Sequence, residues 1–321
     1  LTPLLQYTYT VTLGDSTKTG SFRTFPIPFT PADFSFVFSS CAWTGSNSVV
    51  FDAIRDAHPL FYLNAGDLFY GDIADNDEAL YADPFHKTLT APRQQALYAS
   101  TAFVYVWDDH DFGPNNSDGS MECGPAAASS YRRTVPHYTL SVDTQDGLEP
   151  QPARSIHHAF TVGTARFIVT DLRSQRVPRF EDDGPAKTCL GGHQLEWLLA
   201  EFEAAADHDV VFWVSTMPFH DAQKKWGWYQ HERGVIVDAL AALRLSSKVI
   251  VLSGDAHMLA VDDGSNAPGG VTVFHASALD QRGSVKGGPY SKGPLPGNGQ
   301  WARVSLSHTK DGVCVTYDGH R

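Results

Sequence analysis

The chain has no run of about 18 consecutive apolar residues, the length that a membrane-spanning helix needs. It also has no internal repeat and no low-complexity segment. Its 321 residues are 42% hydrophobic and 19% charged, which is ordinary for a globular protein with a substantial core. We therefore expect neither a membrane-spanning segment nor a repeat architecture.

Basic residues are also in short supply. The sequence has 24 lysines and arginines against 36 aspartates and glutamates, which gives a formal charge of −12. An acidic chain is repelled by the phosphates of nucleic acids and by anionic membranes, so no specific nucleic-acid binding is expected. A small anionic substrate is still acceptable if bound metal supplies positive charge locally.

Cysteine is scarce, with four residues at Cys41, Cys123, Cys189 and Cys314 and no Cys-x-x-Cys pair. A structural zinc site is therefore not expected. Cys123 and Cys189 lie in segments that contain Gly and Pro, and we predict a disulfide between them, with other pairings left open. The chain opens without a basic and then apolar leader, and without Met, which suggests a processed or trimmed start. The cysteine count fits an oxidising compartment, and we expect a secreted or periplasmic protein.

Short apolar runs alternate with segments of helical spacing along most of the chain. Residues 1–26 alternate in polarity and predict a β-hairpin that ends at Pro26-Ile27-Pro28. The predicted strands are 34–38, 60–63, 101–106, 155–162, 165–170, 210–214 and 249–252, with further β structure in 270–274 and 301–317. The predicted helices are 48–58, 77–98 in two pieces broken near Pro84 or Pro92, 192–206 and 234–245, and 112–130 is expected to be a loop. This order predicts an α/β protein with two sheets.

Four of the predicted strands end in residues that commonly bind metals. These ends carry Cys41, Asp67 with Tyr70, Asp109 with His110, and Asp255 with His257. Ligands gather at the carboxyl ends of strands in α/β sheets, so we expect these side chains to meet. Crowded buried carboxylates repel one another unless cations or protons neutralise them, and no Lys or Arg adjoins them in the sequence. A pair of metal ions is therefore predicted.

The ligand types divide into two kinds. A thiolate, a phenolate, an imidazole and a carboxylate together suit trivalent iron, whereas carboxylate and amide oxygens suit calcium, magnesium or manganese. Asp67 is the natural bridge because Tyr70 follows it by one turn. Two bridged metals about 3.5–4 Å apart can bind a phosphoryl group, activate hydroxide and stabilise a leaving oxygen.

The ordered motifs resemble the alkaline phosphatase D family, a branch of the calcineurin-like and purple-acid-phosphatase-like metallophosphoesterases. The motifs are Ser40-Cys41, Gly66-Asp67-Leu68-Phe69-Tyr70, Trp107-Asp108-Asp109-His110-Asp111 and Gly254-Asp255-Ala256-His257. The resemblance spans Phe34 to about Val261. It implies a four-layer α/β/β/α sandwich over residues 31–321, and it implies that the hairpin, residues 1–30, is the remnant of an N-terminal β domain.

Carried over residue by residue, the resemblance also implies two metal sites. Fe3+ would be held by Cys41, Asp67, Tyr70 and His257, and a second cation by Asp67, Asp109 and Asp255. The second cation is expected to be Ca2+, with Mn2+, Mg2+ or Zn2+ as alternatives. His110 would protonate the leaving oxygen or stabilise the transition state.

Substrate contacts are expected from two stretches. Asn115 or Asn116 would add an oxygen ligand or contact phosphate. The aromatic stretch from Trp226 to Tyr229 would receive a lipid or a nucleoside.

Other polar residues are given different roles. Lys224 and Lys225 are interpreted as a solvated pair in preference to a substrate contact. Three arginines are interpreted as structural ion-pair formers in preference to phosphate clamps: Arg173, Arg176 and Arg233. His220 is displaced from the place where other relatives carry a metal-binding His, and we do not expect it in the site.

The resemblance implies hydrolysis of phosphate esters by a metal-bound hydroxide, on monoesters and also on diesters, by a protein that we expect to be a monomer. One alternative is a phospholipase D-type phosphodiesterase that acts on lipid or nucleoside diesters. The other is a binding protein that has kept the scaffold and lost activity, which a broken motif would indicate. Each motif is intact, so the enzyme is favoured.

Overall fold

The computed structural model describes residues 1–141 and 155–321. The strands are β1 (Gln6–Leu13), β2 (Ser16–Arg23), β3 (Phe34–Ser39), β4 (Phe61–Ala65), β5 (Ala102–Val106), β6 (His158–Val162), β7 (Ala165–Val169), β8 (Val210–Val214), β9 (Val249–Ser253), β10 (Met258–Asp262), β11 (Thr272–Ala276), β12 (Lys292–Pro296), β13 (Trp301–Thr309) and β14 (Gly312–His320). The helices are α1 (Val50–Asp56), α2 (Glu78–Thr90), α3 (Pro92–Ser100), α4 (Asp109–Phe112), α5 (Gly124–Thr134), α6 (Gly192–Ala204) and α7 (Gln230–Ala242), with 3-10 turns η2 (Ala205–Asp207), η3 (Lys225–Trp228) and η4 (Pro268–Gly270).

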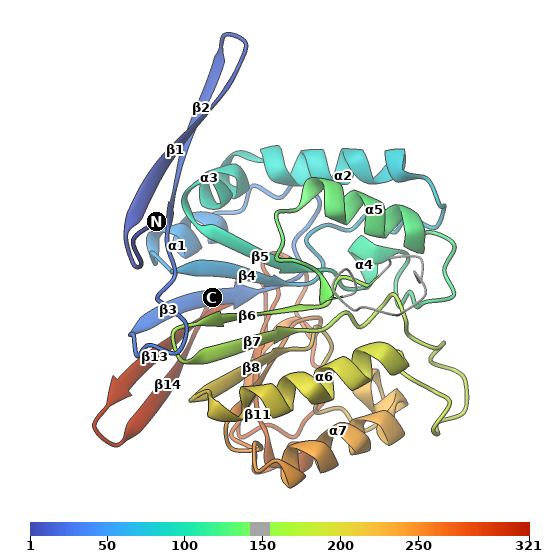
Figure 1. The fold of residues 1–321 in the computed structure, drawn as a ribbon. Helices are drawn as coiled ribbons and strands as arrows, with labels where there is room; N and C mark the ends of the chain where they lie inside the picture. The colour runs from blue at the N-terminus through green and yellow to red at the C-terminus, as the bar shows by residue number, and fades with distance from the viewer. Residues whose placement is uncertain (142–154) are drawn as a thin grey trace.

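Two sheets stack face to face and are covered by helices on their outer faces (Figure 1). One sheet has the strand order β14-β13-β3-β4-β5, and the other has the order β12-β10-β11-β9-β8-β7-β6. Helices α1, α2, α3 and α5 lie over the first sheet, and α6 and α7 lie over the second (Figure 1). The predicted four-layer α/β/β/α sandwich is therefore confirmed.

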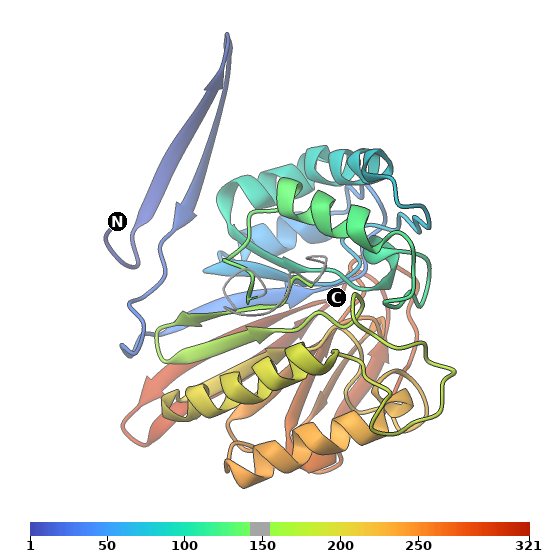
Figure 2. The same ribbon diagram turned by 45° about the vertical axis from the view of Figure 1, so that its right-hand side comes forward.

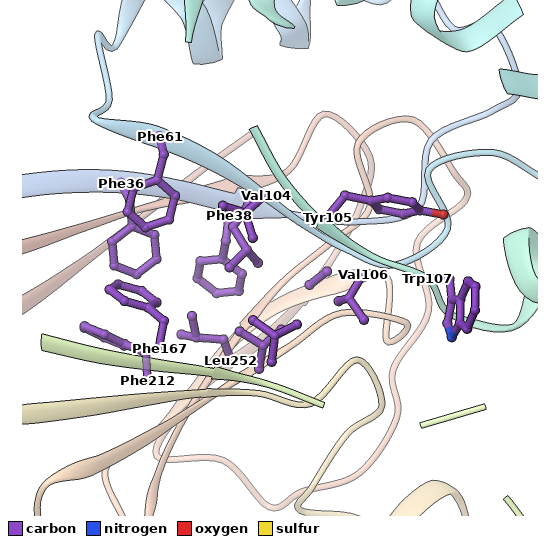
Figure 3. Close-up of a cluster of buried hydrophobic side chains, with 14 of the residues drawn as sticks. Phe36, Phe38, Phe61, Val104, Tyr105, Val106, Trp107, Phe167, Phe212 and Leu252 are labelled. Carbon is purple, nitrogen blue, oxygen red and sulfur yellow. The ribbon is translucent and has the colours of Figure 1, made fainter. Parts of the chain in front are cut away.

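Aromatic residues fill the space between the sheets (Figure 3). Phe36 and Phe61 of the first sheet stack with ring centroids 5.0 Å apart. Phe167 and Phe212 of the second sheet meet Phe36 edge-on at 5.2 and 5.1 Å. Such pairs add about 0.5–1.5 kcal/mol each beyond their buried area. This packing fixes the two sheets relative to each other and so positions their strand ends.

Two glycines allow the carboxyl ends of strands from both sheets to approach closely. Gly254 follows β9, and a Cβ there would lie 2.5 Å from Ser40 Oγ and 2.6 Å from the Ala65 carbonyl oxygen. Gly66 follows β4 with φ +101°, and its Cβ would lie 2.5 Å from Asp108 Cβ. Any larger residue at either position would force apart the edge on which the predicted ligands sit.

The predicted N-terminal hairpin is confirmed as the pair β1–β2, with register from Gln6↔Arg23 to Leu13↔Ser16. It projects away from the sandwich in both views (Figure 1 and Figure 2). It contacts the sandwich through α3, where the Tyr9 hydroxyl donates to the Ala99 carbonyl at 3.5 Å. Its assignment as the remnant of a β domain stays a prediction.

Most predicted elements are present, but the helices α4 and α5 and the strands β10 and β12 were missed. The helical stretch after Asp77 breaks at Pro92, while Pro84 lies inside α2. The segment expected to be a loop contains the start of α5, which has Pro in its first turn and an alanine run behind it. Strands β10 and β12 were also missed, because β12 holds Gly and two Pro at an edge of its sheet. No helix in residues 1–141 or 155–321 is both long and apolar enough to cross a membrane.

The predicted disulfide is wrong, because the structure forms no disulfide between Cys123 and Cys189. Cys123 precedes α5, where its thiol lies 3.6 Å from the Phe112 carbonyl oxygen. Cys189 is buried in a separate apolar cluster with Leu190 and Trp213. The two cysteines therefore belong to different packing units.

Candidate metal centre

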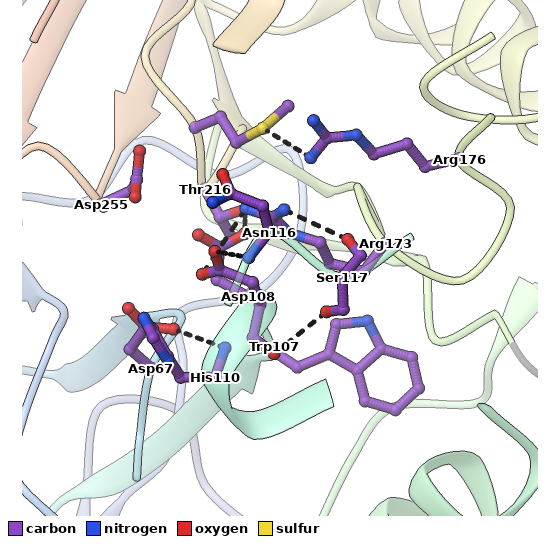
Figure 4. A network of polar contacts seen from close by, with 12 residues as sticks. Asp67, Trp107, Asp108, His110, Asn116, Ser117, Arg173, Arg176, Thr216 and Asp255 are labelled. Carbon is purple, nitrogen blue, oxygen red and sulfur yellow. Dashed lines mark hydrogen bonds and ion pairs between the residues drawn. The ribbon is translucent and has the colours of Figure 1, made fainter. Parts of the chain in front are cut away.

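The predicted ligands converge where the carboxyl ends of β3, β4, β5 and β9 meet. Asp67 lies at the centre, two residues after the end of β4, and Figure 4 shows it together with Asp108, His110 and Asp255. Cys41, Asp67, Asp255 and His257 all have left-handed backbone, with φ between +52° and +64°. This conformation costs on the order of 1 kcal/mol for a residue other than glycine, and such strain is concentrated at functional sites.

On one side of Asp67, the predicted iron ligands come together. Asp67 Oδ2 lies 3.4 Å from Cys41 Sγ and 3.1 Å from the Tyr70 hydroxyl, which in turn is 3.4 Å from His257 Nε2. His257 Nδ1 is 2.8 Å from the Arg282 carbonyl oxygen. Donation from Nδ1–H to that oxygen leaves the Nε2 lone pair facing the site, as in metal-binding histidines.

On the other side of Asp67, carboxylates dominate. Ligand atoms of Asp67, Asp109 and His110 lie within 4.8 Å of one another, as do those of Asp108, Asp109 and Asp255. The site therefore has two unlike halves, one with a thiol, a phenol and an imidazole beside Asp67 and one made mainly of carboxylates, and the residues present could hold a pair of cations.

The electrostatics of the carboxylates and the thiol are compatible with a cation bound at the centre. Burial, followed by the charges of Asp109 and Asp108, raises the pKa of Asp67 to about 8. Burial and the neighbouring Asp67 raise the pKa of the Cys41 thiol. Among the described atoms, Asp108 Oδ2 is buried and has no hydrogen-bond partner. A bound cation would favour the ionised form of each of these groups.

No Lys or Arg adjoins these carboxylates in the sequence, but three basic residues from distant parts of the chain reach them in the fold. Arg173 Nε donates to Asp108 Oδ1 at 2.6 Å, and its Nη2 lies 3.7 Å from Asp109 Oδ1. Lys225 and Lys286 both bind Asp255, at 2.8 and 2.9 Å. The structural ion-pair role of Arg173 is thus confirmed.

These basic side chains oppose the effect of burial on the pKa of two carboxylates. Burial raises the pKa of Asp109, but Arg173 and Lys225 outweigh it and leave that pKa below its usual range. Burial likewise opposes ionisation of Asp255, and Lys225 and Lys286 hold its pKa well below the ordinary value. Lys225 is 7% exposed, so its interpretation as part of a solvated pair is wrong.

His110 faces the cavity and is held from two sides. Its Nδ1 lies 2.7 Å from Asp72 Oδ1, and its ring lies 4.2 Å from that of Tyr70. Its backbone N–H donates to Asp67 Oδ1 at 3.3 Å. Burial lowers the pKa of His110, but Asp67, Asp109 and Asp72 outweigh it and raise the pKa overall. The structure thus favours the protonated imidazole.

The acidic motif is held rigid by hydrogen bonds. Asp111 accepts from the backbone N–H of Asp108 at 2.6 Å and of Leu68 at 2.9 Å, and from the Tyr105 hydroxyl at 2.6 Å. Asp108 in turn accepts from Thr216 Oγ1 at 2.7 Å (Figure 4). These contacts tie the strand ends of β4 and β5 together and fix the direction of Asp109.

A cavity of about 930 Å³ opens over this centre. Asn115 and Asn116 line it as expected, and the Asn116 backbone N–H donates to Asp109 Oδ2 at 2.7 Å. Four basic residues also line it: Arg179, Lys224, Lys225 and Lys286. Asp67, Asp221 and Asp255 line it too, so the cavity carries charges of both signs, and its basic wall can attract an anionic ligand.

The predicted substrate contacts of Trp226 and Tyr229 are wrong. Trp226 is fully buried against Trp213 and Phe219, and Tyr229 is fully buried with its hydroxyl bonded to Arg176. Both residues belong to or follow the 3-10 turn η3, in which positions three apart point the same way. Trp228 lies between them and lines the cavity instead.

His220, Arg176 and Arg233 all have structural contacts. His220 lies outside the cavity lining and packs against Tyr290 with ring centroids 5.7 Å apart, as expected. Arg176 and Arg233 are structural, but their partners are neutral: Tyr229 and Met217 for Arg176, and the carbonyls of Phe219 and Asp221 for Arg233.

Sequence reasoning missed several residues of the site. Asp108 and Arg173 lie inside motifs that stand out in the sequence, so their presence in the site could have been predicted. The ion pair between them could not, because the two residues are far apart in the sequence. Asp72, Lys225 and Lys286 had no such signal, because each acts on a residue at least 30 positions away.

The family model for "PhoD-like phosphatase" matches residues 36–287, which is most of the chain and contains every predicted ligand. The chain belongs to the PhoD-like phosphatase family. It is 26% identical over 192 residues to alkaline phosphatase D of Bacillus subtilis (strain 168), and that match covers 51% of this chain and 32% of that protein. The chain thus matches about a third of the length of this curated relative.

Solved structures agree on the fold. The chain is similar to a structure of PhoD with a TM-score of 0.76 and 17% identity, over 98% of this chain and 74% of that one. It is also similar to purple acid phosphatase PPD1 from yellow lupin (Lupinus luteus) seeds, with a TM-score of 0.58 and 11% identity, over 99% of this chain and 58% of that one. The chain therefore has the sandwich fold of these two structures.

Proposed function

We propose that this PhoD-like phosphatase hydrolyses phosphate esters at a binuclear metal centre. The observation that carries the proposal is the convergence of a thiol, a phenol, an imidazole and several carboxylates around Asp67, under a cavity with a basic wall. Fe3+ is proposed on Cys41, Asp67, Tyr70 and His257, and Ca2+ on Asp67, Asp109 and Asp255. When bound, these cations would polarise the phosphoryl group and lower the pKa of a water molecule.

The chain's own residues supply the rest of the chemistry. The basic cavity wall attracts the phosphoryl group and orients it over Asp67. His110 is proposed as the general acid: Asp72 engages its Nδ1, so Nε2 is left to give a proton to the leaving oxygen. Asp108, the neighbour of Asp109 in the chain, is held by Arg173 and Thr216. We give Asp108 the role of positioning Asp109 and no contact with the substrate.

Both mono- and diesters are proposed as substrates, because the cavity is larger than a phosphate group. Its lining is mainly charged and polar, with Trp228 and Val285 as large apolar members, which suits a polar ester better than a lipid chain. A monomer in a secreted or periplasmic location is proposed as well.

Hydrolysis of p-nitrophenyl phosphate and of bis-p-nitrophenyl phosphate tests the proposal. We expect activity that falls at least 100-fold in Asp67→Asn, because the central carboxylate would hold both cations. Asp238→Asn, on the exposed face of α7, serves as the matched control. Wild-type activity in Asp67→Asn would refute the proposal, and a strong diester preference would favour the phosphodiesterase alternative.

Tyr70 provides an independent spectroscopic readout. Iron-loaded protein is expected to show a tyrosinate-to-iron charge-transfer band in the visible, and Tyr70→Phe should lose it. Tyr9→Phe, in the distant hairpin, should keep it. If the band persists in Tyr70→Phe, Tyr70 is not an iron ligand.

A further inference from the structure

Asp255 is the one proposed metal ligand that already has two ammonium groups bound to it. Lys225 Nζ lies 2.9 Å from Oδ1 and 2.8 Å from Oδ2, and Lys286 Nζ lies 2.9 Å from Oδ1. Lys286 Nζ also contacts the Asp255 backbone carbonyl oxygen. Both lysines line the cavity, so they lie on the side of Asp255 from which a cation and a substrate would arrive.

The loop that carries Lys225 is built to present it. Lys225 has φ +52° and is nearly fully buried, which is rare for lysine unless a partner compensates. Asp221 Oδ1 accepts from the backbone N–H groups of Gln223 and Lys224, and Arg233 donates to the Asp221 carbonyl oxygen at 2.7 Å. These bonds fix the turn immediately before Lys225.

The loop that carries Lys286 is braced against the same turn. The Gly288 N–H donates to the His220 carbonyl oxygen at 2.8 Å. A Cβ on Gly287 would lie 2.3 Å from that oxygen, so only glycine permits this approach. The two lysine-bearing loops therefore form one unit, and Asp255 is the carboxylate on which they converge.

The third basic residue of the site, Arg173, binds carboxylates other than Asp255. Arg173 binds Asp108 and lies near Asp109, and it is fully buried. The two lysines thus act on Asp255, and through it on the second cation position, whereas the ligands of the iron side have no lysine within ion-pairing distance among the described residues.

We propose that Lys225 and Lys286 compete with the second cation for Asp255 and, once displaced, bind the phosphoryl oxygens of the substrate. This inference rests on the proposed function and deepens it. A divalent ion on Asp255 and Asp109 would lie next to two like charges, which weakens its binding. A phosphoryl group that accepts the displaced ammonium groups relieves this repulsion. Cation and phosphate should therefore strengthen each other's binding, by the same factor in both directions.

Isothermal titration calorimetry with Ca2+ on the iron-loaded protein tests the inference, with and without inorganic phosphate. We expect Lys225→Gln and Lys286→Gln to bind Ca2+ roughly tenfold more tightly than the wild type in the absence of phosphate. Both variants should also lose much of the gain in Ca2+ affinity that phosphate produces in the wild type. Lys310→Gln is the control, since Lys310 is exposed in the turn between β13 and β14 and lies outside the cavity lining.

Unchanged or weaker Ca2+ binding in Lys286→Gln would overturn the inference. Lys286 is only partly buried, so we expect Lys286→Gln to fold and to give a Ca2+ affinity even if Lys225→Gln does not fold. Hydrolysis is measured separately on the wild type. The expected Ca2+ shifts without hydrolysis would refute the proposed function alone, and hydrolysis without the shifts would refute the role of the lysines alone.

Discussion

The hydrogen bond between Asp72 and His110 gives a sharp test of the proposed general acid. Asp72→Asn keeps an acceptor for His110 Nδ1 and removes the negative charge. Three carboxylates raise the pKa of His110, but bound cations would neutralise the other two, Asp67 and Asp109. Asp72 is thus the charge expected to persist in the loaded enzyme.

The size of the effect follows from the geometry. The Nδ1–Oδ1 distance is 2.7 Å, and the Asp72 side chain is 49% exposed. Partly exposed ion pairs of this kind contribute about 0.2–1 kcal/mol, which corresponds to about 0.15–0.7 pH unit. In the proposed mechanism the protonated imidazole of His110 is the active form, so a lower pKa means that activity is lost at a lower pH. We expect the alkaline limb of kcat/KM to move down by that amount in Asp72→Asn.

The assay is the pH dependence of kcat/KM with two substrates. Asp72→Ala also removes the acceptor that orients the ring, and its loss of activity should approach 100-fold on an alkyl phosphate. The loss should be smaller on p-nitrophenyl phosphate, whose leaving group departs without a proton. Asp75→Asn, an exposed neighbour in the same segment, is the control. An unchanged alkaline limb in Asp72→Asn, or equal losses on both substrates in Asp72→Ala, would refute the role of His110.

Two further predictions concern stability. Gly254→Ala should lower the free energy of unfolding by about 1–3 kcal/mol, because its methyl group would meet Ser40 and the Ala65 carbonyl oxygen; urea denaturation measures this, and Gly184→Ala, where a Cβ meets open space, should be close to neutral. Burial lowers the pKa of His157 and His275 to about 3 and of His158 to about 4. The unfolded chain therefore binds more protons below pH 6.5, and each histidine should cost about 2 kcal/mol of stability at pH 5 relative to pH 7.5. His275 makes no hydrogen bond among the described residues, so His275→Phe should lessen this acid-induced loss, and an undiminished loss would contradict the assignment.

The residues of the candidate metal centre could be predicted from the sequence because each of them follows a recognisable local pattern. Asp67, for example, follows five fully buried strand residues, and a polar side chain at such a point has few roles other than a turn or a site. Parallel strands then bring such ends to one edge, a consequence of topology that needs no side-chain detail. The fold class and the two halves of the centre follow from the same reasoning.

The partners of those ligands were not predictable in the same way. Lys225 stands beside an identical neighbour, and one of the pair is buried on Asp255 while the other is exposed. The two lysines differ in burial because Lys225 has a left-handed backbone conformation and because its loop packs against the loop of Lys286. Neither feature produces a periodic pattern in the sequence. Trp226 and Trp228 differ for the same reason, because a single 3-10 turn decides which of them reaches the cavity.

Net charge was a poor guide to the site for a related physical reason. The chain carries −12 overall, yet its cavity is lined by four of its basic residues. Charges at short range in a partly buried cavity act more strongly than charges spread over a solvated surface. The carboxylates at the floor would be neutralised by cations, whereas the basic wall would remain to face the solvent. An acidic protein can thus present a positive entrance to an anionic substrate, and the lysines on Asp255 stand where the acidic floor and the basic wall meet.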